Sequence, residues 1–151
     1  MGLLGLVAGW GCRAEPPPSP FRPVADMKQL MASVLEPAAD GYWDAVGTID
    51  DEKGSTSFAP RSDEEWIAVR DRAYLIAESG NLLMITPRAP DAAEWTRLSQ
   101  ALVEAGRRAI AAAESRDPAA VFDAGAEVYE ACSKCHASYA IQLVRPGDRR
   151  E

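Results

Sequence analysis

The chain has 151 residues, enough for one ordinary domain with a real hydrophobic core. Hydrophobic residues make up 47% and charged residues 26%, a composition that excludes a disordered chain. The formal net charge of −7 disfavours nucleic-acid binding and suits a basic partner protein, although a merely solubilising charge explains the total equally well.

The first residues predict an export signal followed by a tether. Residues 1–11 are small and apolar, and Cys12 follows them, which gives a leader of residues 1–12. This run is too short to span a bilayer but suits the apolar region of a secretory signal. It also resembles a bacterial lipoprotein signal, so lipid anchoring through Cys12 and an ordinary cleaved signal both stay open. Residues 13–23 are proline-rich and predict a tether that cannot join a packed core.

A helical domain is predicted over residues 24–145, with a short tail at residues 146–151. The first amphipathic helix covers residues 24–46 and contains Pro37, which should kink or break it near residues 34–36. Residues 47–61 are polar and contain Gly and Ser, which predicts a long loop without strands.

Three further helices follow, each with a recognisable beginning. Ser62 and Glu65 predict a capping box at the second, and Asp91 with Glu94 predicts another at the third. Asp117 before a proline predicts the start of the fourth. Gly80 is expected to end or weaken the second helix, with the apolar residues 82–85 adding a turn before Pro87.

Apolar residues repeat at alternating spacings of three and four in these three helices, and the short connections favour antiparallel neighbours. An all-α, antiparallel up-down-up-down four-helix bundle is therefore expected. The predicted core stripes comprise Trp66, Val69, Ala73 and Ile76, then Trp95, Leu98, Leu102, Ala105, Ala109 and Ala112, and finally Val121, Gly125, Val128, Cys132, Cys135 and Tyr139.

Residues 132–136 read CSKCH and carry the most chemical information in the chain. Two thiols at this spacing can add across the two vinyl groups of a haem, and the histidine that follows can bind the iron, so C-x-x-C-H is typical of c-type haem attachment. Cys132 and Cys135 are then the thioether residues. His136 is the only histidine in the chain, so it is the only imidazole that can serve as proximal ligand.

Other chemistries use the same pattern. A bare C-x-x-C can be a dithiol redox pair, which usually accompanies a βαβ pattern, or half of a zinc site, which needs further Cys or His ligands. A chance match is the third alternative. No strand pattern and no second Cys/His pair supports the first two, so the sequence favours one covalent haem c.

With this motif late in a helical chain, the sequence resembles the class II c-type cytochromes, the cytochrome c prime family and its low-spin relatives. The resemblance covers residues 24–144 and rests on Cys132, Cys135, His136 and the aromatic Tyr139 three residues later. It implies a four-helix bundle with the haem inside and with Tyr139 packed against it. Members commonly carry a basic residue near the haem propionates, for which Arg22 and Lys28 are weak candidates here.

The resemblance places the first helix on the distal side of the haem. Met27 and Met31 lie four residues apart on one face of that helix, and Met31 is favoured as sixth iron ligand, with Met27 as its alternative and Met84 third. Both can instead be core filler, because methionine packs irregular gaps well.

Methionine ligation implies a single-electron carrier, whereas an open distal face implies a five-coordinate protein that binds nitric oxide or carbon monoxide. Peroxidase chemistry is the third hypothesis, after the electron carrier and the gas-binding protein, and no enzymatic activity is expected. The leader and the haem together imply the periplasm, with or without a lipid anchor, and basic redox partner proteins. A homodimer is also compatible with the family.

Overall fold

The structure is a computed structural model that describes residues 20–91 and 93–140. The predicted leader with Cys12, most of the tether and the C-terminal tail lie outside these residues. In chain order the elements are α1 (Met27–Leu30), the π-helical η1 (Met31–Leu35), α2 (Glu36–Trp43), β1 (Gly47–Asp51), β2 (Gly54–Phe58), α3 (Asp63–Leu83), α4 (Glu94–Ser115) and α5 (Pro118–Tyr139).

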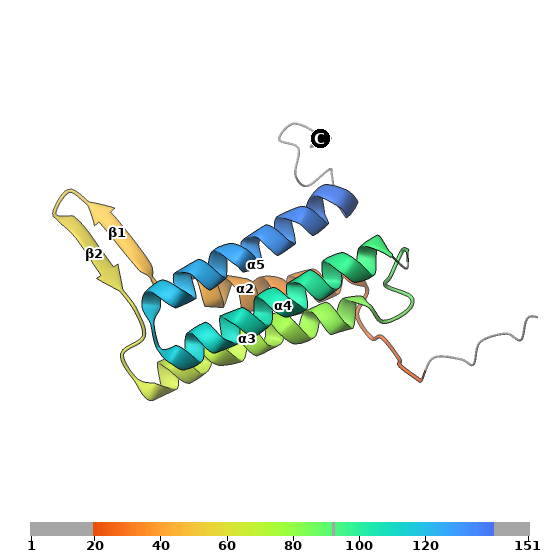
Figure 1. Ribbon diagram of the computed structural model, residues 1–151, viewed down its shortest axis with the longest axis horizontal. Helices are drawn as coiled ribbons and strands as arrows, with labels where there is room; N and C mark the ends of the chain where they lie inside the picture. The colour runs from red at the N-terminus through yellow and green to blue at the C-terminus, as the bar shows by residue number, and fades with distance from the viewer. Residues whose placement is uncertain (1–19, 92, 141–151) are drawn as a thin grey trace, which may run out of the picture.

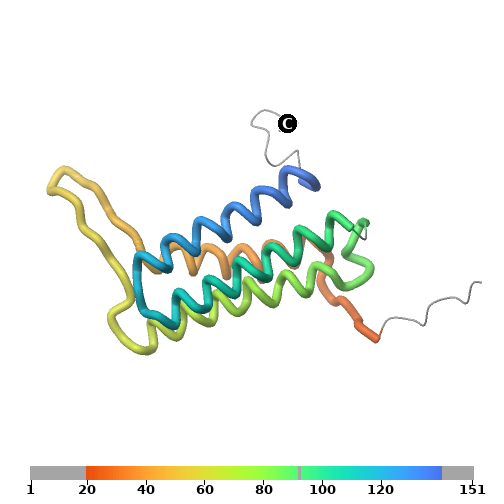
Figure 2. Tube along the Cα trace, in the orientation of Figure 1, coloured from red at the N-terminus to blue at the C-terminus, as the bar shows by residue number. Residues whose placement is uncertain are grey.

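The predicted helical class is confirmed: the described residues are mostly helical, and α1, η1 and α2 form one helical segment that packs together with α3, α4 and α5. The helical segment 27–43, formed by α1, η1 and α2, packs against α3, and the end of it in α2 also contacts α5. α3 lies along α4, and α4 lies along α5 (Figure 1). The Cα trace in Figure 2 shows the three long helices side by side, with the short segment 27–43 among them.

The disturbance expected at Pro37 takes the form of a π-helical stretch rather than a break. Proline has no N–H to offer the carbonyl four residues before it, and its ring crowds that carbonyl. The helix widens just before the proline, and the Glu36 N–H donates to the Met31 carbonyl, five residues earlier. The first helical segment therefore continues through residue 43.

The prediction of a long loop at residues 47–61 is wrong, because most of this segment is a β-hairpin. β1 and β2 pair antiparallel with Thr48 opposite Ser57, and their hydroxyls lie 3.1 Å apart. Gly54 begins β2 with a φ of 123°, which a residue with a side chain rarely adopts. The strands are short and almost wholly exposed, so the alternation of apolar and polar residues that predicts a strand is missing.

Two of the three predicted helix starts are confirmed. Ser62 and Glu65 form the capping box of α3, and the Asp117 side chain caps α5 ahead of its proline. The capping box predicted at Asp91 is wrong. α4 begins at Glu94, and Asp91 instead accepts a hydrogen bond from the Trp95 backbone at 3.0 Å.

Gly80 does not end α3, which continues to Leu83. It is buried against α4, where an added Cβ would lie 2.8 Å from the Ser99 carbonyl oxygen. The glycine is therefore used for a close approach of two helices. The predicted stripes are otherwise sound: every member of those on α3 and α4 is buried, as are Val121, Gly125 and Val128 on α5, while its last three members are half-buried.

Candidate functional site

The C-x-x-C-H motif lies in the last two turns of α5. Cys132, Cys135 and His136 are all half-buried. Residues three apart in an α-helix lie close to the same face, so the two thiols project in similar directions. Neither thiol forms a disulfide within the described chain, and both pack against the hydrophobic core. The motif therefore presents two free thiols and an adjacent imidazole at one end of the helical domain.

Burial favours the protonated form of both thiols. It raises the pKa of Cys132 to about 11, with a smaller contribution from neighbouring Cys135. Burial also raises the pKa of Cys135, and the carboxylate of Glu94 at the start of α4 adds to the effect. A buried thiol with a raised pKa is a poor nucleophile at neutral pH.

Tyr139, predicted to pack against haem, lies against α4 in this structure. Its ring meets the Trp95 ring edge-on, with centroids 4.8 Å apart and an angle of 79° between the planes. Its hydroxyl donates a hydrogen bond to the carboxylate of Asp91. This bond is the main cause that raises the pKa of Tyr139 to about 12 and lowers the pKa of Asp91.

The two candidate distal ligands lie at the starts of α1 and η1, where the first helical segment passes from α-helix to π-helix. Met27 is the first residue of α1 and Met31 the first of η1, and both are half-buried against the core. Met84 is half-buried at the end of α3. Arg22 and Lys28, the weak candidates for a propionate contact, are exposed.

α5 and the first helical segment diverge toward the end of the molecule that carries the motif (Figure 1). α5 packs along α4 and contacts α2, whereas η1 packs on α3. The half-buried methionines and the half-buried motif therefore lie at the same end of the domain, on two helices that diverge there.

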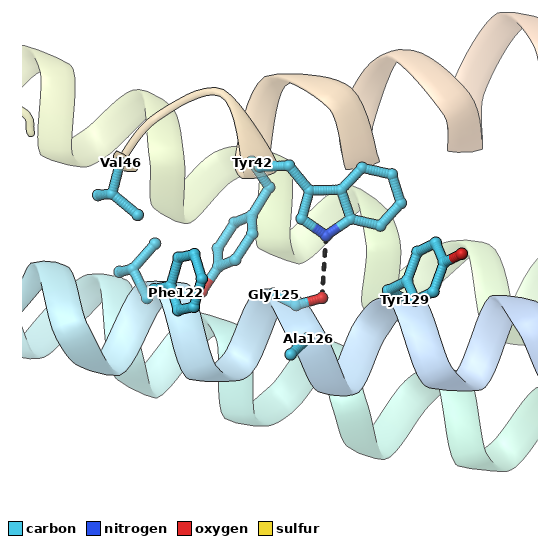
Figure 3. A pocket seen from close by; sticks show the side chains of 8 residues that line it. Tyr42, Val46, Phe122, Gly125, Ala126 and Tyr129 are labelled. Carbon is cyan, nitrogen blue, oxygen red and sulfur yellow. Dashed lines mark hydrogen bonds between the residues drawn. The ribbon is translucent and has the colours of Figure 1, made fainter. Parts of the chain in front are cut away.

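A separate apolar hollow of about 320 Å³ lies between α2 and the first half of α5. Trp43 lines it, and its indole nitrogen donates to the Gly125 carbonyl oxygen at 2.9 Å. Figure 3 draws this bond as a dashed line, with Phe122 and Tyr129 on either side of Gly125. None of the predicted site residues lines it. Sequence reasoning missed Trp43, because nothing local to a tryptophan at a helix end indicates a partner 82 residues away.

Comparison of the chain with protein-family models, with curated proteins and with solved structures finds no match. Among the described residues, no three His, Cys, Asp or Glu side chains come together as a set of metal ligands. None of the described helices is long and apolar enough to cross a membrane.

Proposed function

We propose that this protein is a mono-haem c-type cytochrome that carries single electrons. Cys132 and Cys135 would hold the haem through thioethers, and His136 would bind the iron on the proximal side. Bound haem supplies a one-electron iron couple, and the protein sets its potential through the axial ligands and the surrounding dielectric.

The observation that carries the proposal is the setting of the motif. Two free thiols one turn apart, and the only imidazole of the chain beside them, lie half-buried on a helix that diverges from the helix carrying Met27 and Met31. These donors fit a haem. Its four pyrrole nitrogens already bind the iron, so the protein needs to supply only axial ligands, and the imidazole is one of them. Apolar residues around the motif would keep the ring from water.

The dithiol and zinc alternatives fit this setting less well. A redox dithiol needs a thiol whose pKa is lowered, and burial raises the pKa of both Cys132 and Cys135. A structural zinc ion needs four protein ligands, and among the described residues no three His, Cys, Asp or Glu side chains come together as metal ligands.

The finer architecture belongs to the same proposal. We infer an antiparallel up-down-up-down four-helix bundle in which the segment 27–43 is the first helix and α5 would hold the haem inside the bundle. That is the arrangement implied by the class II resemblance. Packing of α3 on α4 and of α4 on α5, with short connections, supports it.

On the distal side, Met31 is the proposed sixth ligand, because it lies half-buried at the first residue of the π-helical η1. π-Helical turns occur frequently at functional sites. With Met27 and Met31 both serving as packing instead, the same site would be five-coordinate and would bind nitric oxide or carbon monoxide.

The leader and the charge extend the proposal to location and partners. An exported chain would work in the periplasm, soluble or anchored through Cys12. The net charge of −7 would attract basic redox proteins, with a steering effect that salt weakens.

The test is a pair of visible spectra, oxidised and reduced, of the chain made in a host that assembles c-type haem. We expect a low-spin c-type spectrum from the wild type. The control is a double variant with Cys132→Ala and Cys135→Ala, which should show no haem absorption after purification. A wild type without haem absorption would refute the proposal, and a high-spin spectrum that responds readily to carbon monoxide would replace the carrier with the gas binder.

A further inference from the structure

The loop between α3 and α4 is tied to both helices that would flank the haem. It follows Leu83, the last residue of α3. Arg88 reaches the chain just before α1, and Asp91 reaches the last turn of α5. One short segment thus contacts both the chain before α1, on the proposed distal side of the haem, and the end of α5, on the proximal side.

Arg88 fixes the entry to α1. Its Nε and Nη2 atoms donate to the Ala25 carbonyl oxygen at 3.3 and 2.9 Å, and its Nη1 donates to the Leu82 carbonyl oxygen at 3.0 Å. The side chain therefore joins the end of α3 to a point two residues before Met27. A guanidinium suits this task because its planar set of donors can reach two carbonyls at once.

Asp91 fixes the end of α5. One carboxylate oxygen accepts from the Trp95 N–H in the first turn of α4, and the other accepts from the Tyr139 hydroxyl. Trp95 is itself held, because its indole nitrogen donates to the Leu83 carbonyl oxygen at 2.9 Å. Tyr139 lies one helical turn beyond His136, so holding its ring fixes the rotation of the turn that carries the imidazole.

We propose that residues 84–91 form a brace that sets the position of His136 relative to the two methionines, with Arg88 and Asp91 as its positioning residues. This inference rests on the proposed function. Arg88 acts through α1 and Asp91 through Tyr139, and neither needs to touch the haem. The brace would fix the orientation of His136 and of the first helix, and such outer contacts orient the ligands of a bound haem and tune its potential.

The first part of the test measures whether the brace holds the two helices in place, and it does not depend on bound haem. Amide hydrogen exchange is measured in peptides covering residues 27–35 and 132–140 of the full chain. We expect Arg88→Ala to speed exchange about tenfold in the first segment alone, and Asp91→Ala to do so in the second alone, as the loss of charge-assisted hydrogen bonds predicts. Asp91→Asn keeps an acceptor for Tyr139 and should restore most of the protection. Exchange unchanged in both segments would overturn the brace, whether or not haem is bound.

The second part of the test measures whether the brace positions His136 relative to the methionines in the haem-loaded protein. Both alanine variants should shift the reduction potential and the low-spin absorption of the wild type, and Asp91→Asn should largely restore them. The matched control is Arg108→Ala, which removes an ion pair with Glu127 that joins α4 to α5 without involving residues 84–91. Spectra and potentials no different from this control would show that the brace is structural only. A chain that takes up no haem would refute the proposed function, while the exchange measurement would still decide the brace.

Discussion

The indole nitrogen of Trp43 donates a 2.9 Å hydrogen bond to the carbonyl oxygen of Gly125, and so joins the end of α2 to the middle of α5. An intact α5 offers this carbonyl a helical partner as well, so the oxygen is shared between two donors. Gly125 has no Cβ, and one added there would lie 3.1 Å from the Trp43 ring. The glycine thus lets the indole approach the α5 backbone, and the bond ties the first helical segment to the helix that carries the motif.

Trp43→Phe should loosen this connection. The variant loses the N–H donor and part of the ring that meets Tyr129 edge-on, with centroids 6.1 Å apart. We expect the free energy of unfolding in urea to fall by about 1–2 kcal/mol, from one hydrogen bond and some lost packing. Tyr129→Phe is the control, because it keeps the ring contact. A Trp43→Phe variant as stable as this control would show that the bond contributes nothing.

Gly106→Ala should be costly because α3 and α4 meet there through their backbones. An added Cβ would lie 2.7 Å from both the Cα and the Cβ of Ala77, and neither atom can turn away. We expect a loss of about 1–3 kcal/mol in unfolding free energy, as for other overpacked positions. At Gly41 the nearest atoms belong to the Arg72 side chain, which can move, so Gly41→Ala should be neutral or stabilising through helix propensity. Equal effects of the two variants in thermal unfolding would contradict this account.

The parts of the fold that the sequence predicted are those fixed by local chemistry. Ser62 and Asp117 cap the helices that follow them because each bond forms within a few residues. The buried stripes follow from helical periodicity alone. The hairpin was missed because its strands are exposed and polar, and Gly80 was misinterpreted because its reason is a neighbour on α4.

The candidate site divides in the same way. The motif residues Cys132, Cys135 and His136 were found from their spacing, since the chemistry demands consecutive positions. Asp91 was predicted to form a capping box with Glu94, and its bond to Tyr139 was missed because the two residues lie 48 positions apart. Arg88 was missed entirely, since it binds backbone carbonyls that any residues could supply.

Met31→Ala should open the distal face of the haem-loaded protein. If the thioether binds iron, its loss shifts the spectrum toward high spin, lowers the reduction potential and lets the ferrous protein bind carbon monoxide rapidly. Met27→Ala should leave the spectrum unchanged and cost about 1–2 kcal/mol of stability, because a half-buried side chain loses less than the roughly 2–5 kcal/mol of a fully buried one. If Met27→Ala opens the site instead, the ligand lies one turn earlier than proposed.

The bond between Asp91 and Tyr139 should make stability depend on pH at both extremes. Hydrogen bonds from Tyr139 and from the Trp95 backbone lower the pKa of Asp91, so its contribution is present above about pH 4 and is lost as the pH falls through the lower folded value. The bond to Asp91 raises the pKa of Tyr139 to about 12, so that contribution is present below about pH 10 and is lost as the pH rises through about 12.

Urea unfolding of the wild type and of Asp91→Asn from acid to neutral pH measures the acid side. The advantage of the wild type should shrink as the pH falls below about 4, because the charge of Asp91 is then lost. A constant difference between the two proteins would show that the carboxylate charge has no part in the bond.

The covalent attachment of haem to Cys132 and Cys135 is the central claim, and an intact mass measured under denaturing conditions tests it most directly. For the mature chain made in a host that assembles c-type haem, we predict the mass of the polypeptide plus one haem. The variant with both Cys132→Ala and Cys135→Ala should have the mass of the polypeptide alone. A wild-type mass without haem, from a host that attaches haem to a known cytochrome c in parallel, would contradict the account.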